Sequence, residues 1–152
     1  MGNAWAKFLR TVDQKRKELR LKEGEECFFR GHSECTWDLA PTLLRHCNER
    51  GRNSPTEIRD LEAALYFEFR ARARELHDQS SEWDILFSMR HHGVATRLLD
   101  WTETLGVAVF FALRDATETS RPCVWLLNPY ALNEMSREGR DLVAPEYLPN
   151  PA

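Results

Sequence analysis

The feature that most constrains this chain of 152 residues is the stretch from His91 to Leu113, HHGVATRLLDWTETLGVAVFFAL. Its first half is rich in polar side chains, and its second half is almost entirely apolar. Buried polar groups cost free energy unless they are hydrogen-bonded. The stretch therefore requires either an internal network or a bound ligand. Its polar members are His91, His92, Thr96, Arg97, Asp100, Thr102 and Thr104.

The composition is that of an ordinary globular domain, with 42% hydrophobic and 30% charged residues. A net charge of −3 and a pI near 6.0 do not indicate a general nucleic-acid binder. These values are still compatible with a local basic groove. No apolar run approaches the roughly 18 residues that span a membrane, and the N-terminus lacks the apolar core of a secretory signal. We expect a cytoplasmic protein without a membrane partner, whose four cysteines are reduced.

Hydrophobic periodicity predicts an α+β fold with a small mixed or antiparallel sheet and several packed helices. Apolar residues at Trp5, Phe8, Leu9 and Val12 have helical spacing, so we expect residues 1–24 to form a helix that packs on a domain of residues 25–152. Strands are expected at 25–32 and 122–127, with a short strand or extended run at 94–99. Helices are expected from 54 to 76, from 81 to 91, from 105 to 114 and from 130 to 140.

Two helix starts carry sequence signals. Ser54, followed by Pro55 and Glu57, has the pattern of a capping box. Before the helix at 105–114, Asp100 with Glu103 resembles a second capping box, and Thr102 is the alternative cap. This second helix is apolar nearly all round, which predicts a central, buried position.

Arg30 stands in the middle of the first expected strand. Because side chains alternate across a strand, Phe28, Arg30 and His32 should share one face. An arginine there is explained either by an acidic neighbour at the sheet rim or by a phosphate or carboxylate ligand that its planar fork binds. The sequence leaves both explanations open.

The sequence gives little support for a metal site or for catalysis by a nucleophilic side chain. Cysteines and histidines crowd residues 27–47, but their spacing does not provide paired CxxC motifs, so we predict no metal. No serine has the GxSxG context of a hydrolase. His92 remains open between an ordinary loop residue and a hydrogen-bond donor to a substrate.

Arg97, Asp100, Thr102 and Thr104 surround an expected helix N-terminus, where amide groups and the helix dipole favour anions. Together with Arg30 they form a plausible pocket for a phosphate-bearing ligand. The alternative is an internal network in which Asp100 pairs with Arg97 or Arg30 and no ligand is needed.

The chain resembles the FRG domain family, on a first motif that stands here as Phe29-Arg30-Gly31 and a second that runs from Thr96 to Thr102 as TRLLDWT. His32 replaces a glutamine found in many members, and Thr104-Leu105 replaces a Ser-Pro. The resemblance implies a bacterial or phage protein but no defined activity. The remaining matches are Trp37, Leu39, Pro41, Leu44, Arg45, His91-His92-Gly93, Ala108 and Phe111-Ala112.

A looser resemblance is to ADP-ribosyltransferases, through the aromatic-Arg-Gly motif, Thr102-Glu103-Thr104 and Phe111-Ala112. It implies NAD as substrate, with Arg30 on the phosphate and ribose side and the threonines around nicotinamide. Arg30 and Thr102 are then the implied catalytic residues. The implied NAD-binding residues are Arg30, Gly31, His32, His92, Arg97, Asp100, Thr102 and Thr104.

The chain departs from that class because it has no late strand with a Glu-x-Glu or Gln-x-Glu signature; Glu134, Glu138 and Glu146 lie in helix or loop contexts. We therefore expect a domain truncated at its C-terminal end, whose catalytic acid lies beyond Ala152 or comes from another chain. A protein partner that completes or regulates the domain is then expected. The leading expectation is an ADP-ribosyltransferase-like NAD-binding domain, a toxin or anti-phage effector. A non-enzymatic module for protein or nucleotide is the alternative. A nucleic-acid module resting on arginines 70–74 and the basic first helix is the third.

Overall fold

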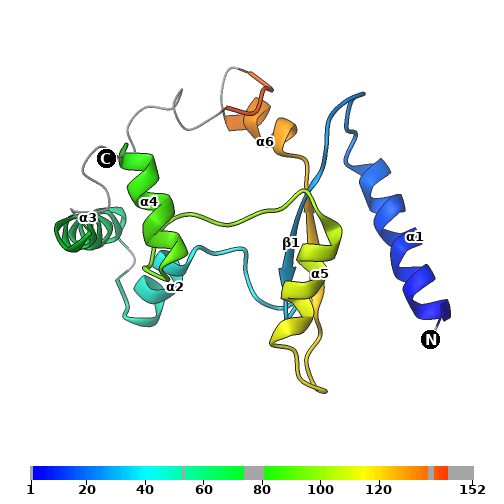
Figure 1. Cartoon of the computed structure of the whole chain (residues 1–152), viewed down its shortest axis with the longest axis horizontal. Helices are drawn as coiled ribbons and strands as arrows, with labels where there is room; N and C mark the ends of the chain where they lie inside the picture. The colour runs from blue at the N-terminus through cyan, green and yellow to red at the C-terminus, as the bar shows by residue number, and fades with distance from the viewer. Residues whose placement is uncertain (1, 53, 74–80, 137–138, 144–152) are drawn as a thin grey trace. The chain divides into compact units, whose positions relative to one another are not determined.

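The computed structural model describes residues 2–52, 54–73, 81–136 and 139–143. Within these ranges it contains six helices and one sheet of two antiparallel strands (Figure 1). The α+β prediction is confirmed. The elements are α1 Gly2–Glu18, β1 Phe28–His32, α2 Thr42–Glu49, α3 Pro55–Arg72, α4 Glu82–His91, α5 Leu105–Arg114, β2 Cys123–Leu127 and α6 Pro129–Ser136.

The chain forms two compact units. Unit 1 comprises Met1–Trp37 and Asp100–Leu142, and unit 2 comprises Asp38–Leu99 and Val143–Ala152. Unit 1 holds α1, the sheet, α5 and α6, whereas unit 2 holds α2, α3 and α4. The boundary between Leu99 and Asp100 falls inside the TRLLDWT run, so this motif contributes residues to both units.

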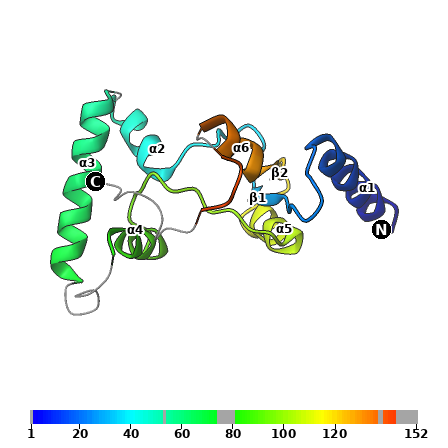
Figure 2. The same cartoon turned by 90° about the horizontal axis from the view of Figure 1, so that it is seen from above.

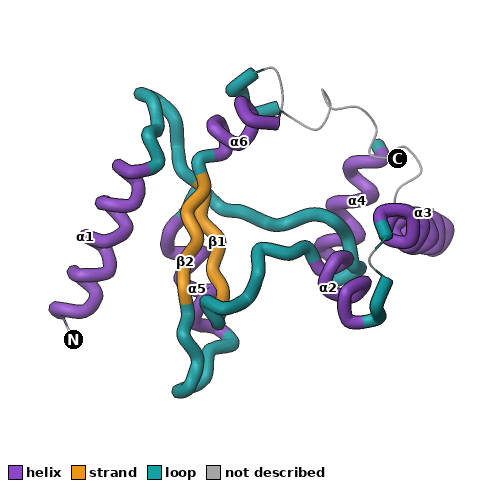
Figure 3. Tube along the Cα trace, turned by 180° about the vertical axis from the view of Figure 1, so that it is seen from behind, coloured by secondary structure: helices purple, strands orange, loops and turns teal. Residues whose placement is uncertain are grey.

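The sheet of unit 1 pairs β1 with β2 in antiparallel orientation (Figure 3). Its register places Arg30 opposite Trp125 and His32 opposite Cys123. The other edge of β1 makes one further antiparallel bridge. There the Phe29 amide donates to the Thr102 carbonyl oxygen at 2.7 Å, and the Thr102 amide donates to the Phe29 carbonyl oxygen at 2.9 Å. The residues before α5 are therefore fastened directly to the strand that carries Arg30.

One face of the sheet packs on α5, which lies in front of the strands in Figure 1 and behind them in Figure 3. Phe29 is buried there with Val12 of α1, Cys27 and Ala108 of α5. A Cβ atom on Gly31 would lie 1.9 Å from the Ala108 carbonyl oxygen and 2.6 Å from the amide nitrogen of Ala112. Only a glycine allows β1 and α5 to approach this closely.

The prediction that α5 is centrally buried is wrong. Only Ala108 and Ala112 are buried, whereas Phe110 is 58% exposed and Leu113 57% exposed. A two-stranded sheet covers one side of a helix, so the opposite side remains in solvent even though its residues are apolar.

Unit 2 is a helical unit with two apolar clusters. Leu43 and Cys47 of α2 pack with Ala95 and with Ile58 and Leu61 of α3. In the second apolar cluster, Ile85, Leu86 and Met89 of α4 are buried against residues of α3 and of the 94–98 segment. Figure 2 shows α3 as the longest helix of this unit.

Local predictions in unit 2 had mixed outcomes. The Ser54–Glu57 capping box is confirmed, and Ser81 caps α4 in the same way with Asp84. Residues 94–99 form no strand; the Leu43 amide donates to the Thr96 carbonyl oxygen in this segment at 3.3 Å. No helix within the described ranges has both the length and the apolar character needed to cross a membrane.

Candidate functional site

Arg30 of the first motif contacts Asp100, the part of the TRLLDWT motif that lies in unit 1. Its Nε donates to Nε2 of His32 at 3.2 Å, and its Nη1 donates to the Asp100 carbonyl oxygen at 2.6 Å. The second contact joins residues 70 positions apart in the chain. The guanidinium fork is thereby held in a fixed direction over the face of the sheet that points away from α5.

His32 is 8% exposed and also faces Trp125, whose Nε1 donates to His32 Nδ1 at 3.2 Å. A neutral imidazole has only one accepting nitrogen, so the ring accepts from either Arg30 or Trp125 but not from both at once. The Trp37 ring lies 6.3 Å from the His32 ring, centroid to centroid, and is 57% exposed. We call Arg30, His32, Trp37 and Trp125 the Arg30 face.

The turn before α5 is held by Thr102. Besides its backbone bridge to Phe29, its hydroxyl accepts a hydrogen bond from the Thr104 amide at 3.1 Å. Thr104 is the N-cap of α5 and makes no side-chain capping bond. The prediction that Asp100 or Thr102 caps this helix is therefore wrong, because the bridge to β1 places Thr102 in the sheet and starts the helix two residues later.

Arg97 belongs to unit 2 and has a carboxylate partner. Its Nε donates to Oε2 of Glu62 at 2.5 Å, its Nη2 contacts the same oxygen, and its backbone amide donates to Oε1 at 3.2 Å. The Glu62 side chain is only 8% exposed. The bond to Glu62 raises the pKa of the Arg97 guanidinium. This partner was not predicted from the sequence. Glu62 follows Ile58 by four residues and so lies on the same, buried face of α3. A carboxylate at such a position indicates a buried ion pair.

His92 also belongs to unit 2. It ends α4, where its backbone amide donates to the Ser88 carbonyl oxygen at 2.9 Å. Its ring lies 6.0 Å from Phe69 and 5.4 Å from His91, measured between centroids. A contact between His92 and a substrate stays a prediction.

Of the eight NAD-binding residues expected from the sequence, six lie in unit 1, on β1 or in residues 100–104. His92 and Arg97 lie in unit 2 and are held there by contacts of their own. Within unit 1, Gly31 has a packing role against α5, on the opposite face of β1 from Arg30. Trp125 was not expected at this site, because its position depends on the register of β2 against β1, which sequence periodicity does not give.

The cysteines and histidines of residues 27–47 do not gather into a metal site. Cys27 and Cys47 are buried in the cores of different units, and burial raises the pKa of the Cys27 thiol. No group of three or more His, Cys, Asp or Glu side chains in the described part of the chain is placed to hold a metal ion. All four cysteines are free thiols.

Arg74, on which the nucleic-acid expectation partly rests, lies outside the described ranges. Glu138 and Glu146, two of the late glutamates, also lie outside them. Within α3, Arg72 pairs with Glu68 at 2.6 Å. Glu134 of α6 accepts a hydrogen bond from Arg140 at 2.6 Å. These ion pairs explain the positions of Glu68, Glu134 and Arg72 without a ligand.

The family of the chain is now defined. The model of the FRG domain matches residues 25–121, which is more than half of the chain, so the chain belongs to the FRG domain family. The match spans both motifs, Phe29-Arg30-Gly31 and TRLLDWT, and the hydrogen bond from Arg30 to Asp100 joins them in space. No curated protein and no solved structure matches the chain.

Proposed function

We propose that the Arg30 face of unit 1 binds NAD and that the chain is an ADP-ribosyltransferase-like domain, acting as a bacterial toxin or anti-phage effector. The observation that carries this proposal is the anchoring of Arg30 by the Asp100 carbonyl oxygen, with the His32 ring beside its Nε atom. A guanidinium held in one direction binds a phosphate group with little loss of side-chain entropy.

The surrounding residues suit the other parts of a dinucleotide. Trp125 lies opposite Arg30 in the sheet, and the exposed ring of Trp37 lies beside His32. Both side chains provide flat apolar surfaces on which a ring can stack. Thr102 and Thr104 stand immediately before α5, and their hydroxyl groups can hydrogen-bond a carboxamide such as that of nicotinamide. In this scheme Arg30 holds the phosphates, and Thr102 and Thr104 line the nicotinamide side.

The proposed reaction breaks the bond between the ribose carbon and the nicotinamide nitrogen, and nicotinamide leaves as the neutral base. Water or an acceptor side chain then bonds to the ribose carbon and loses a proton. A carboxylate is needed to stabilise the developing positive charge on the ribose. We propose that a partner chain supplies it.

The test measures NAD binding by calorimetry, because nicotinamide release also requires the carboxylate that the partner chain supplies. Arg30→Ala should weaken NAD binding at least tenfold. Arg45→Ala is the matched control, since the Nη1 of Arg45 also donates to a backbone carbonyl, that of Ala40, at 2.6 Å. The proposal fails if the unaltered chain does not bind NAD, or if both substitutions lower only the melting temperature.

A second candidate function, a protein-binding module, is favoured by the outer face of α5. Phe110, Phe111, Val107 and Leu113 are between 41% and 58% exposed. Contiguous apolar surface of this kind marks many protein interfaces. If NAD does not bind, Phe110→Asp should weaken the binding of a purified partner at least tenfold, while Arg114→Ala, at the end of the same helix, should not.

A further inference from the structure

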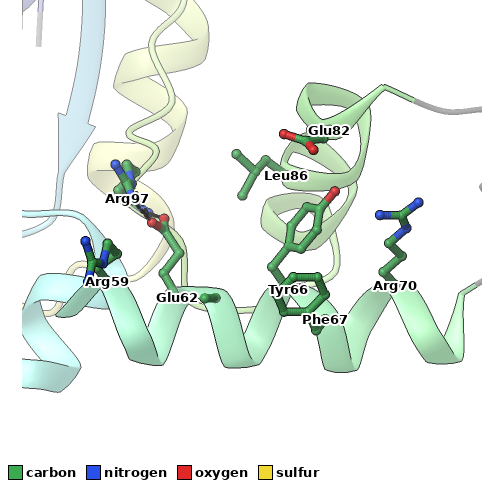
Figure 4. A pocket seen from close by; sticks show the side chains of 9 residues that line it. Arg59, Glu62, Tyr66, Phe67, Arg70, Glu82, Leu86 and Arg97 are labelled. Carbon is green, nitrogen blue, oxygen red and sulfur yellow. Dashed lines mark hydrogen bonds and ion pairs between the residues drawn. The ribbon is translucent and has the colours of Figure 1, made fainter. Parts of the chain in front are cut away.

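A cavity of about 120 Å³ lies between α3 and α4 of unit 2 (Figure 4). Its walls include the rings of Tyr66 and Phe67 on α3 and the side chain of Leu86 on α4. The Arg97–Glu62 pair lies at one end of the cavity, and Arg70 lies at the other end. The family match and the NAD proposal assign no role to this cavity.

Two polar atoms in the cavity wall lack partners. The Tyr66 hydroxyl oxygen and the Glu82 Oε2 atom are both buried, and neither has a hydrogen-bond partner among the described residues. Few buried polar atoms remain unsatisfied in folded proteins. In Figure 4 the Tyr66 hydroxyl points up from α3 toward Glu82 and Arg70. Two such atoms from different helices, lining one cavity, indicate that a third group belongs between them.

The two atoms have complementary hydrogen-bonding chemistry. Burial, together with the negative charge of Glu82, raises the pKa of the Tyr66 hydroxyl, so it keeps its proton at neutral pH and can donate. The charge of Arg70 and its contact with the hydroxyl oppose this shift, but by distance and angle the hydroxyl has no hydrogen-bond partner among the described residues. An ionised carboxylate only accepts. The missing group should therefore present an N–H donor to Glu82 and a carbonyl acceptor to Tyr66.

The size and charge of the cavity narrow the ligand further. An apolar protein cavity of roughly 150 Å³ can hold a benzene molecule, so a cavity of about 120 Å³ suits one ring-sized group. The flat walls of Tyr66 and Phe67 favour a planar ring. The guanidinium groups of Arg70 and Arg97 at the two ends disfavour a cation.

We propose that the α3–α4 cavity binds a neutral, single-ring compound with an amide-type edge, in which an N–H group stands beside a carbonyl oxygen. Glu82 accepts the N–H hydrogen, Tyr66 donates to the carbonyl oxygen, and Leu86 and Phe67 contact the ring. Pyrimidine nucleobases and nicotinamide both carry this edge. The proposal does not depend on NAD binding at the Arg30 face.

The test compares three probes of similar size by ligand-observed NMR titration of the full chain. Benzamide offers a donor and an acceptor, benzoate offers acceptors and a negative charge, and toluene offers neither. Benzamide should bind at least tenfold more tightly than benzoate or toluene. Cytosine and nicotinamide, titrated in parallel, distinguish a nucleobase from a pyridine carboxamide as the source of the edge. The proposal is overturned if no probe binds, or if toluene binds as well as benzamide.

Variants assign the binding to the two atoms. Tyr66→Phe should weaken benzamide binding about tenfold and leave toluene binding unchanged. Tyr130→Phe in α6 is the matched control and should change neither. Glu82→Gln should reduce the preference for benzamide over benzoate, because the amide nitrogen of glutamine can donate to a carboxylate. Arg30→Ala should leave benzamide binding intact. Unchanged benzamide affinity in Tyr66→Phe would overturn the assignment.

Discussion

Arg30 in unit 1 and Arg97 in unit 2 belong to the two motifs that define the family, yet the two units hold them in different ways. Arg97 pairs with the nearly buried carboxylate of Glu62. Arg30 donates to a backbone carbonyl oxygen and to a histidine ring. The pair with Glu62 accounts for the position of the Arg97 guanidinium. The Arg30 contacts orient its guanidinium over the sheet face that points away from α5, where we propose that NAD binds.

The two units also differ in what determines their packing. Unit 1 depends on a close backbone approach between β1 and α5, which Gly31, Ala108 and Ala112 make possible. Unit 2 depends on side chains of three helices, such as Leu43, Ile85 and Met89, which fill its core. Added volume should therefore damage unit 1 most, and lost side chains should damage unit 2 most.

The largest effect is expected for Gly31→Ala, which places a Cβ atom 1.9 Å from the Ala108 carbonyl oxygen. Backbone atoms cannot give way without moving α5, so we expect unit 1 to lose about 4 kcal/mol or more. Hydrogen exchange should show lost protection in β1, β2 and α5, with α3 and α4 retained. Gly106→Ala is the control within α5, because open space surrounds that glycine, and it should stabilise the helix by about 0.5–1 kcal/mol. Equal protection in both variants would disprove the close-approach argument.

Glu62→Ala should have the next largest effect, in unit 2. Removing one partner of a fully buried ion pair costs roughly 3–5 kcal/mol, but the Arg97 side chain is 53% exposed, so solvent screening reduces the expected loss to about 2 kcal/mol. Urea unfolding measures this loss. Glu68→Ala is the matched control on the same helix, because its pair with Arg72 is exposed and should contribute less than about 0.5 kcal/mol. Similar losses in both variants would remove the contrast between Arg97 and Arg30.

Local sequence signals predicted the features that depend on neighbouring residues. The bounds of α5, the capping box of Ser54 and the common face of Arg30 and His32 all follow from helical period, capping chemistry or strand alternation. The meeting of Arg30 with the TRLLDWT run was inferred from their joint membership of one family pattern. The sequence left open whether an anion stands between them, and the structure shows a direct contact with Asp100.

The features that sequence reasoning missed depend on partners distant in the chain. The Glu62–Arg97 pair spans 35 positions, and the Arg30–Trp125 pairing depends on strand register. The exposure of Phe110 follows from the number of strands that cover α5, which the apolar composition of the helix cannot reveal. Thr104 became the N-cap because Thr102 is bridged to Phe29, and this is again a long-range contact.

Arg30→Ala should have a moderate effect on stability, about 1 kcal/mol, because it removes hydrogen bonds to His32 and Asp100. Arg30→Lys should restore NAD affinity only in part, since an ammonium group cannot bind two phosphate oxygens with a planar fork. Calorimetry with NAD and thermal unfolding measure the two effects separately. Loss of stability well above that of Arg45→Ala, with no change in NAD affinity, would make Arg30 as structural as Arg97.

The smallest expected effect is on the loss of stability at low pH, which should depend on a different carboxyl group in each unit. In unit 1 the guanidinium of Arg140 bonds to Glu25 at 2.8 and 2.7 Å and lowers the pKa of that carboxyl below its ordinary value of 4.5. In unit 2 the hydroxyl of Ser54 lowers the pKa of Glu57 in the same direction. A lowered folded-state pKa means that the stabilisation is complete above the ordinary value and is lost as pH falls through the folded one.

Unit 1 should therefore lose less stability between pH 5 and about pH 3 in Glu25→Gln than in the unaltered chain. In Glu57→Gln the same reduction should be confined to the first turn of α3. Hydrogen exchange at pH 5 and at about pH 3, resolved by segment, distinguishes the two. The effect of Glu25 should appear around residues 20–26 and 139–142, which its bonds to Arg140 connect across 115 positions of the chain. If Glu25→Gln leaves the acid sensitivity of these segments unchanged, the Glu25–Arg140 pair contributes no measurable stability to unit 1, although its side chains are only 12% and 18% exposed.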